Sequence, residues 1–154
     1  MREILFRGKR VDNGEWAIAH NIVIGKSEKC TTRVFIVPKG EYIDDAITKD
    51  SRLILVMPQV EIVPETIGQY TGLTDKNGKK IFEGDVILFE DESPTNYEYH
   101  DSTEMRCGEI KFDWGEFYLT NRVAVEMSDL VYDNKLDGQI VGNIHDNPEL
   151  LKGE

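Results

Sequence analysis

The chain has 154 residues, of which 40% are hydrophobic and 31% charged, a composition that excludes a collagen-like, coiled-coil or wholly disordered protein. Its 18 basic and 29 acidic residues give a formal net charge of -11. The longest uninterrupted apolar run, residues 53–57, is far too short to cross a bilayer, so the sequence predicts a soluble protein with no membrane partner.

The negative charge lies in one half of the chain. Residues 1–77 contain 11 basic and 11 acidic residues, whereas residues 78–154 contain 7 and 18. Such an acidic half repels the phosphate backbone, which argues against direct nucleic-acid binding. Four cations of the first ten residues lie in a predicted hairpin without interleaved aromatic side chains, so they support a nucleic-acid role only weakly: Arg2, Arg7, Lys9 and Arg10.

In the first half of the chain, apolar residues alternate with polar ones or form short runs, which predicts β-strands. Residues 4–6 and 16–24 form a predicted hairpin or meander, with Trp16, Ile18 and His20 on one face of its second strand. Residues 34–37 and 53–57 each stop before a proline, as strands do. The apolar spacing within residues 43–47 predicts one or two helical turns.

The second half continues the pattern of short strands. Asp75-Lys76-Asn77-Gly78 predicts a tight turn, because Asn-Gly tolerates positive φ. Residues 90–106 are polar and acidic and predict a long exposed loop, and residues 128–134 predict a short helical or irregular piece. Asn147 and Pro148 can start a terminal helical turn. Strands are predicted at residues 66–71, 79–82, 86–89, 109–114, 117–119 and 139–144.

Nine or ten short strands with very little helix predict an all-β fold made of short-stranded barrel or sandwich pieces. The natural boundary lies near residue 60, which divides the chain into an N-terminal β subdomain of residues 1–60 and a C-terminal subdomain of residues 61–154. No Gly/Ser linker separates them, so we expect them to pack together as one unit.

The cysteines and histidines do not form a recognised reaction centre. Cys30 and Cys107 lie 77 positions apart without a CxxC spacing, and the N-terminus lacks a secretion signal, which predicts a cytoplasmic protein with reduced thiols. His20, His100 and His145 have no metal-binding or nucleophile-activating context, although Asp146 could orient His145 for proton transfer. No metal and no cofactor are therefore predicted.

Carboxylates offer one possible chemical site, and aromatic residues offer a binding face. Glu83 and Asp85 flank Gly84 and could work as an acid/base pair if both faced a cleft, although a turn explains them as well. Most aromatic residues alternate with polar ones and are expected in the core: Trp16, Tyr70, Phe112, Trp114 and Phe117. Tyr118 has the opposite phase, so it is the predicted exposed aromatic at a contact surface.

Two long segments and the start of the chain resemble the YopX family of phage and prophage proteins. They are residues 63–86, which include Thr71-Gly72-Leu73-Thr74-Asp75 and Phe82-Glu83-Gly84-Asp85-Val86, and residues 141–151, Val-Gly-Asn-Ile-His-Asp-Asn-Pro-Glu-Leu-Leu. The opening residues 4–7 with Trp16 also match. His145 stands where the family pattern suggests an aromatic residue, which argues against a catalytic role for it.

The resemblance implies a phage or prophage origin and a mostly β fold, but it supplies no catalytic residue or cofactor. The turn at residues 83–85 followed by the hairpin at residues 109–119 is similar to small SH3-like barrels, which implies an SH3-like β-barrel for residues 61–154. Barrels of this kind serve many functions, so the fold does not name one.

The leading hypothesis is a non-enzymatic accessory protein that binds a protein partner or itself, with Tyr118 and the loop acids Glu98 and Asp101 as the predicted binding residues. The first alternative is an acidic DNA mimic that occupies a host nucleic-acid-binding protein, because residues 78–154 carry the whole net charge. The second alternative is a small carboxylate-based hydrolase with chemistry around Asp85.

Overall fold

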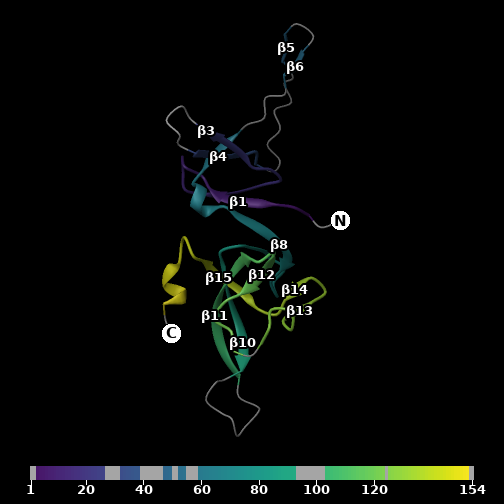
Figure 1. Cartoon of the computed structure of the whole chain (residues 1–154), viewed down its shortest axis with the longest axis vertical. Helices are drawn as coiled ribbons and strands as arrows, with labels where there is room; N and C mark the ends of the chain where they lie inside the picture. The colour runs from purple at the N-terminus through teal and green to yellow at the C-terminus, as the bar shows by residue number, and fades with distance from the viewer. Residues whose placement is uncertain are drawn as a thin grey trace. The chain divides into compact units, whose positions relative to one another are not determined.

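The structure is a computed structural model that describes residues 3–26, 32–38, 47–49, 52–54, 59–92, 103–123 and 125–152, with the backbone alone for residues 26, 47–49, 52–54 and 92 (Figure 1). The chain forms two compact units. The N-terminal unit is Ile4–Gln69, and the C-terminal unit is Tyr70–Glu154 together with Met1–Glu3.

The strands of the N-terminal unit pair in an antiparallel manner. β1 (Phe6–Lys9) and β2 (Trp16–Ala19) form a hairpin, and β4 (Thr32–Ile36) lies between β3 (Val23–Lys26) and β7 (Val60–Ile62). β5 (Ile47–Lys49) pairs with β6 (Arg52–Ile54). Ile47 therefore starts a strand, and the rest of the helical turns predicted for residues 43–47 lies outside the described residues.

The unit boundary falls nine residues later than the sequence boundary at residue 60. β7 pairs with β4, and Gly68 and Gln69 at the start of β8 (Gly68–Thr74) pair with β1. Between these strands, the short 3-10 helix η1 (Pro64–Thr66) places Thr66 to accept a hydrogen bond from the Lys9 amide at 2.8 Å. Residues 60–69 therefore belong to the N-terminal unit through backbone pairing that periodicity along the chain does not reveal.

The core of the N-terminal unit is built from small and branched side chains. Ala17 and Ala19 on β2 pack in one cluster with Val34, Ile36 and Ile62. The sequence predicts that the face of β2 with Trp16 and Ile18 lies in the core. In the structure this face points outward, and Ala17 and Ala19 are buried instead. The close approach of β7 explains this reversal: a Cβ added at Gly8, which pairs with Ala17, would lie 2.5 Å from Ile62 Cδ1.

The C-terminal unit contains a four-stranded antiparallel sheet with the order β12, β11, β10, β15. These strands are β10 (Asp85–Glu92), β11 (Thr103–Asp113), β12 (Glu116–Leu119) and β15 (Gln139–Asn143). The end of β8 pairs with β9 (Lys80–Phe82) and with β14 (Lys135–Leu136), which forms a hairpin with β13 (Val131–Tyr132). A second 3-10 helix, η2 (Pro148–Leu151), follows Asn147 as the sequence predicts.

One apolar cluster fills this unit. Six of its side chains are at most 1% exposed, and they come from β9, β10, β11, β12 and β14: Ile81, Ile87, Phe89, Ile110, Leu119 and Leu136. Five of these six side chains lie on the strands that residues 79–89 and 109–119 predict, whereas Leu136 lies on β14, which the sequence does not predict. The core of the C-terminal unit is therefore largely readable from the sequence.

The all-β prediction is confirmed, because the described residues form strands and two short 3-10 helices. The described sheets are not closed into a barrel, and the SH3-like barrel stays a prediction. The long loop predicted for residues 90–106 is wrong at both ends, since Glu90–Glu92 and Thr103–Arg106 pair as strands. Among the described residues, no helix has the length and apolar character needed to cross a membrane.

Candidate interaction site

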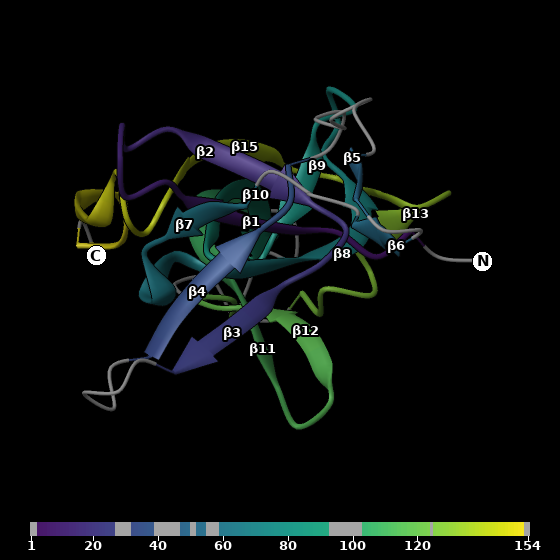
Figure 2. The same ribbon diagram turned by 90° about the horizontal axis from the view of Figure 1, so that it is seen from above.

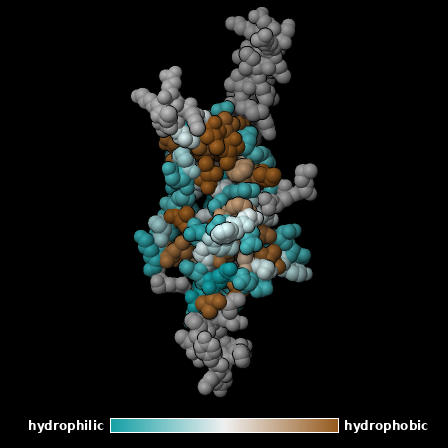
Figure 3. All heavy atoms as spheres, viewed as in Figure 1, coloured by the Kyte–Doolittle hydropathy of each residue, from teal (hydrophilic) through white to brown (hydrophobic). Residues whose placement is uncertain are grey.

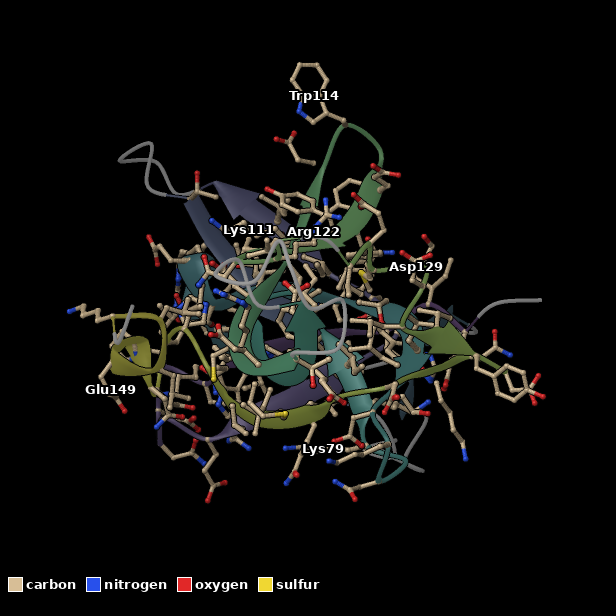
Figure 4. All side chains as sticks on the ribbon, turned by 90° about the horizontal axis from the view of Figure 1, so that it is seen from below. Lys79, Lys111, Trp114, Arg122, Asp129 and Glu149 are labelled. Carbon is tan, nitrogen blue, oxygen red and sulfur yellow. The ribbon has the colours of Figure 1, made fainter. Side chains whose placement is uncertain are left out.

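The β11–β12 hairpin ends in a highly exposed tryptophan. Asp113 pairs with Glu116, so only Trp114 and Gly115 form the loop. Their φ angles of 52° and 89° are both left-handed, which is the geometry of a type I′ turn. Trp114 is 94% exposed, and Figure 4 shows it at the end of the hairpin, directed away from the rest of the C-terminal unit.

Two phenylalanines extend the apolar face of this hairpin from the core to the turn. Ile110 pairs with Leu119 in the core, and Phe112 pairs with Phe117 one step further out. The two phenyl rings lie 4.9 Å apart at an angle of 59°. Phe117 packs against the core cluster, whereas Phe112 is 48% exposed. We call Phe112, Trp114 and Phe117 the aromatic tip.

Carboxylates flank the turn that carries Trp114. Asp113 and Glu116 are exposed and pair across the two strands directly below the turn. Lys111 lies further from the turn, and its Nζ is 3.3 Å from Oε2 of Glu109. The turn that carries Trp114 is therefore flanked by two negative charges, on the face of the hairpin opposite Phe112 and Phe117.

Tyr118, the one predicted binding residue that the structure describes, does not belong to the aromatic tip. Tyr118 is half-buried on the face opposite Phe117 and Leu119, in register with Lys111. Glu98 and Asp101 lie outside the described residues. The prediction that Trp114 and Phe112 belong to the core is wrong, because β11 and β12 continue past the end of the core. The hairpin itself is predicted, and the Trp-Gly pair could also have shown that Trp114 is a loop residue, since Gly often fills the second position of a two-residue hairpin loop.

A buried aspartate braces the turn at residues 75–78. Asp75 is 1% exposed; its Oδ1 accepts hydrogen bonds from the amides of Asn77 and Lys79 at 2.9 Å, and its Oδ2 accepts one from Ile140 at 3.1 Å. Burial opposes ionisation of the Asp75 carboxyl, but these three amides outweigh it, so its pKa is lowered. Asp75 thus ties the turn to β15.

The side chains of Asp85 and Asp91 also accept hydrogen bonds from backbone amides. Asp85 is 2% exposed, and its Oδ2 accepts a hydrogen bond from the Phe82 amide at 2.8 Å, which closes the turn at Glu83 and Gly84. Asp91 accepts hydrogen bonds from the amides of Val123 and Val125 at 2.5 and 3.1 Å, which fixes the chain that follows β12. This geometry supports a structural role for Asp85 rather than the acid/base role considered from the sequence.

Two of the three histidines lie among the described residues, one in each unit. His20 is exposed, and its Nδ1 lies 3.3 Å from the Ile4 carbonyl oxygen. Asn143 Nδ2 donates a hydrogen bond to Oδ2 of Asp146 at 2.8 Å. Asn143 Oδ1 also accepts hydrogen bonds from the amides of both His145 and Asp146, so this segment is a hydrogen-bonded turn. His100 lies outside the described residues.

Cys107 is a half-buried cysteine on β11 that forms no disulfide, and Cys30 lies outside the described residues. Within the described ranges, no group of three or more His, Cys, Asp or Glu side chains could hold a metal ion.

The β1–β2 hairpin of the N-terminal unit combines cations with an aromatic residue. The Arg7 guanidinium carbon lies 4.7 Å from the ring centre of Trp16, and Lys9 Nζ lies 5.9 Å from it. The expectation that these cations have no neighbouring aromatic is therefore wrong. The cations already cover the ring, so Trp16 is a cation–π partner within its own unit rather than an open stacking platform.

The N-terminal unit also exposes several apolar side chains. Val11, Ile18, Val23 and Ile24 are between 38% and 67% exposed. Figure 3 shows hydrophobic residues gathered over this unit on the face that is drawn.

The chain is similar to a solved structure and matches a family model. The chain is similar to protein EF1440 from Enterococcus faecalis, whose crystal structure shares 27% sequence identity over 96% of this chain and 97% of that chain, with a TM-score of 0.45. No curated protein matches the chain. Residues 5–152 match the family described as YopX protein. The match covers nearly the whole chain, and the protein therefore belongs to the YopX family.

Proposed function

We propose that this protein is a non-enzymatic protein-binding module whose contact is the aromatic tip of the β11–β12 hairpin. We further propose, from the family resemblance, that it acts in the host cytoplasm as an accessory protein of a phage or prophage. The observation that supports the binding role is the exposure of Trp114. This bulky aromatic side chain is 94% exposed, and its backbone has a left-handed conformation with φ 52°.

Neither packing nor turn geometry accounts for tryptophan at this position. The left-handed conformation costs an ordinary residue about 1–2 kcal/mol, whereas Asn, Asp and Gly adopt it readily. Burial elsewhere offsets none of this cost, because the side chain contacts solvent almost entirely. Strained residues of this kind cluster at sites where function depends on them.

The tip has the properties of a binding anchor. Tryptophan is enriched among the residues that contribute most to protein–protein affinity, and it buries a large area when a pocket receives it. The two-residue turn fixes the backbone of Trp114, and Phe112 and Phe117 pack on each other behind it. Such preorganisation lowers the entropic cost of binding.

Affinity capture with tip variants tests this proposal. Trp114→Asn removes the aromatic side chain and leaves a residue that suits the turn. Ile24→Ala is the matched control, because Ile24 is an apolar side chain 67% exposed on the N-terminal unit. From an extract of the cells that carry the gene, wild type and the Ile24 variant should retain the same protein, and the Trp114 variant should lose it. Equal capture by all three proteins contradicts the proposal.

The distribution of charge favours a second candidate, the acidic DNA mimic. By composition, the N-terminal unit Ile4–Gln69 has 9 basic and 9 acidic residues, whereas the C-terminal unit has 9 and 20. A decoy would capture basic DNA-binding proteins, and its binding would weaken steeply between about 50 and 200 mM salt. Binding through the aromatic tip would persist over that range, so capture at two salt concentrations separates the two candidates.

A further inference from the structure

The C-terminal unit has a second exposed feature, a hollow of about 300 Å³ beside the β13–β14 hairpin. We call it the β13–β14 pocket. Leu130, which is partly exposed, and the exposed side chain of Tyr132 provide its accessible apolar surface, and the fully buried Leu136 lies beneath it. Its volume is at the small end for ligand pockets, which suits one large side chain. The lining residues are Lys76, Leu130, Tyr132, Lys135, Leu136 and Asp137.

Hydrogen bonds fix the backbone around this pocket. The Asp137 amide donates to the Leu130 carbonyl at 2.7 Å, and the Lys76 amide donates to the Gly138 carbonyl at 3.0 Å. Leu136 is fully buried and belongs to the core cluster. Asp75, next to Lys76, is itself held by three backbone amides. The pocket is therefore formed before any partner binds.

The charges around the pocket are opposite to those around the aromatic tip. Lys76 and Lys135 are exposed at its rim, with one carboxylate, Asp137. Within the described part of the chain, neither lysine takes part in an ion pair. A local excess of positive charge is unusual in a unit with 9 basic and 20 acidic residues. It complements an apolar group flanked by carboxylates.

We propose that the aromatic tip of one copy of this protein inserts into the β13–β14 pocket of a second copy. Trp114 would pack against the accessible parts of Leu130 and Tyr132, while Asp113 and Glu116 would approach Lys76 and Lys135. This inference rests on the tip being a contact surface, as proposed above, and names its occupant. Figure 2 shows the β11–β12 and β13–β14 hairpins leaving the C-terminal unit in different directions, so the contact joins separate molecules.

The two surfaces are different, so the contact is heterologous. Each copy keeps a free tip or a free pocket after pairing, and association continues to rings or open chains. A single anchored side chain buries far less than the roughly 1,200–2,000 Å² of a stable protein–protein interface. The association is therefore weak, with a dissociation constant on the order of 0.1–1 mM. It acts when copies are concentrated locally.

Complementation between two defective variants tests the proposal. Trp114→Asn keeps the pocket and loses the anchor, whereas Lys76→Glu with Lys135→Glu keeps the anchor and loses the pocket. Sedimentation velocity of each variant alone, up to about 1 mM, should show monomers, and wild type should show species that grow with concentration. An equimolar mixture of the two variants should form one-to-one complexes and nothing larger. Lys79→Glu with Lys152→Glu, which makes the same change in net charge at exposed sites outside the pocket, should associate like wild type.

A charge exchange provides the second arm. Adding Asp113→Lys and Glu116→Lys to the Lys76→Glu, Lys135→Glu variant should restore association to within about threefold of wild type. Thermal unfolding checks that each variant is folded. The proposal is overturned if wild type stays monomeric, if the mixture stays monomeric, or if the pocket variant associates like wild type. Each of these results leaves the captured protein partner of the proposed function untouched, so the two proposals can fail separately.

Discussion

The two hairpins of the C-terminal unit use the same short turn with very different residues. In β13–β14, the loop residues Asp133 and Asn134 have φ 48° and 60°, and both residue types tolerate this conformation. In β11–β12, Trp114 takes the position of Asp133 at φ 52°. The first turn is made of residues that suit its backbone, and the second carries one that does not. Their difference separates residues that maintain the fold from residues available for binding.

The largest effect on this comparison of the two hairpins is expected when the Asp75 carboxylate, which braces the turn next to the β13–β14 hairpin, is removed. Asp75→Ala leaves the amides of Asn77, Lys79 and Ile140 without their buried acceptor. We expect a loss of about 3 kcal/mol in the free energy of unfolding. Urea denaturation followed by circular dichroism measures it. A loss below about 1 kcal/mol would show that water replaces the carboxylate without penalty.

The same brace should depend on pH. The folded-state pKa of Asp75 is lowered from 3.8, so its carboxylate stabilises the protein above that value and stops doing so as pH falls through the lowered pKa. The difference in stability between wild type and Asp75→Asn should therefore stay constant from about pH 7 to pH 5 and shrink below about pH 4. A difference that grows on acidification contradicts the assigned role.

Exchanging the first loop residues tests the comparison directly. Asp133→Trp places a bulky aromatic at φ 48°, which should lower the free energy of unfolding by about 1 kcal/mol. Chemical denaturation of the variant at low protein concentration measures the change without self-association. An unchanged stability would mean that the β13–β14 turn accepts tryptophan, and the argument from strain at Trp114 would lose its support.

The reciprocal change should have a comparable or smaller effect of opposite sign. Trp114→Asn introduces Asn-Gly, the preferred pair for this turn, and should raise the free energy of unfolding by up to about 1 kcal/mol. The melting temperature should rise by roughly 2–4 °C. A variant that is more stable than wild type yet defective in capture would show that Trp114 is retained for binding. A less stable variant would show that it supports the fold.

Local turn chemistry and alternation predicted much of the C-terminal unit. The turn at residues 75–78 closes as expected, with Gly78 at φ 82° and its amide bonded to the Asp75 carbonyl at 2.9 Å. Ile110 and Leu119 lie in the core with the predicted phase. The same pattern misplaced Phe112 and Trp114, because period-two alternation gives the face of a residue but not whether the core reaches that far along the strand.

The missed elements depend on contacts between distant residues. Ala17 and Ala19 occupy the buried face of β2 because β7 approaches Gly8 so closely, and no local signal along residues 16–24 reports that approach. Residues 90–92 and 103–106 are expected in a loop but form strand ends. The inward-facing residue there is the carboxylate Asp91, which accepts hydrogen bonds from two amides more than 30 positions away, so the apolar alternation typical of a strand is missing. Asp75 could be recognised as a turn residue, but its bond to Ile140 could not.

The uneven division of charge between the two units has a consequence for how the protein behaves in concentrated solution. The N-terminal unit is electrically neutral in sequence and carries exposed Val11, Ile18, Val23 and Ile24, a combination that favours precipitation. The C-terminal unit supplies the whole excess of negative charge, and the mutual repulsion of like-charged molecules keeps them dispersed. One unit thus provides the colloidal stability on which the other depends.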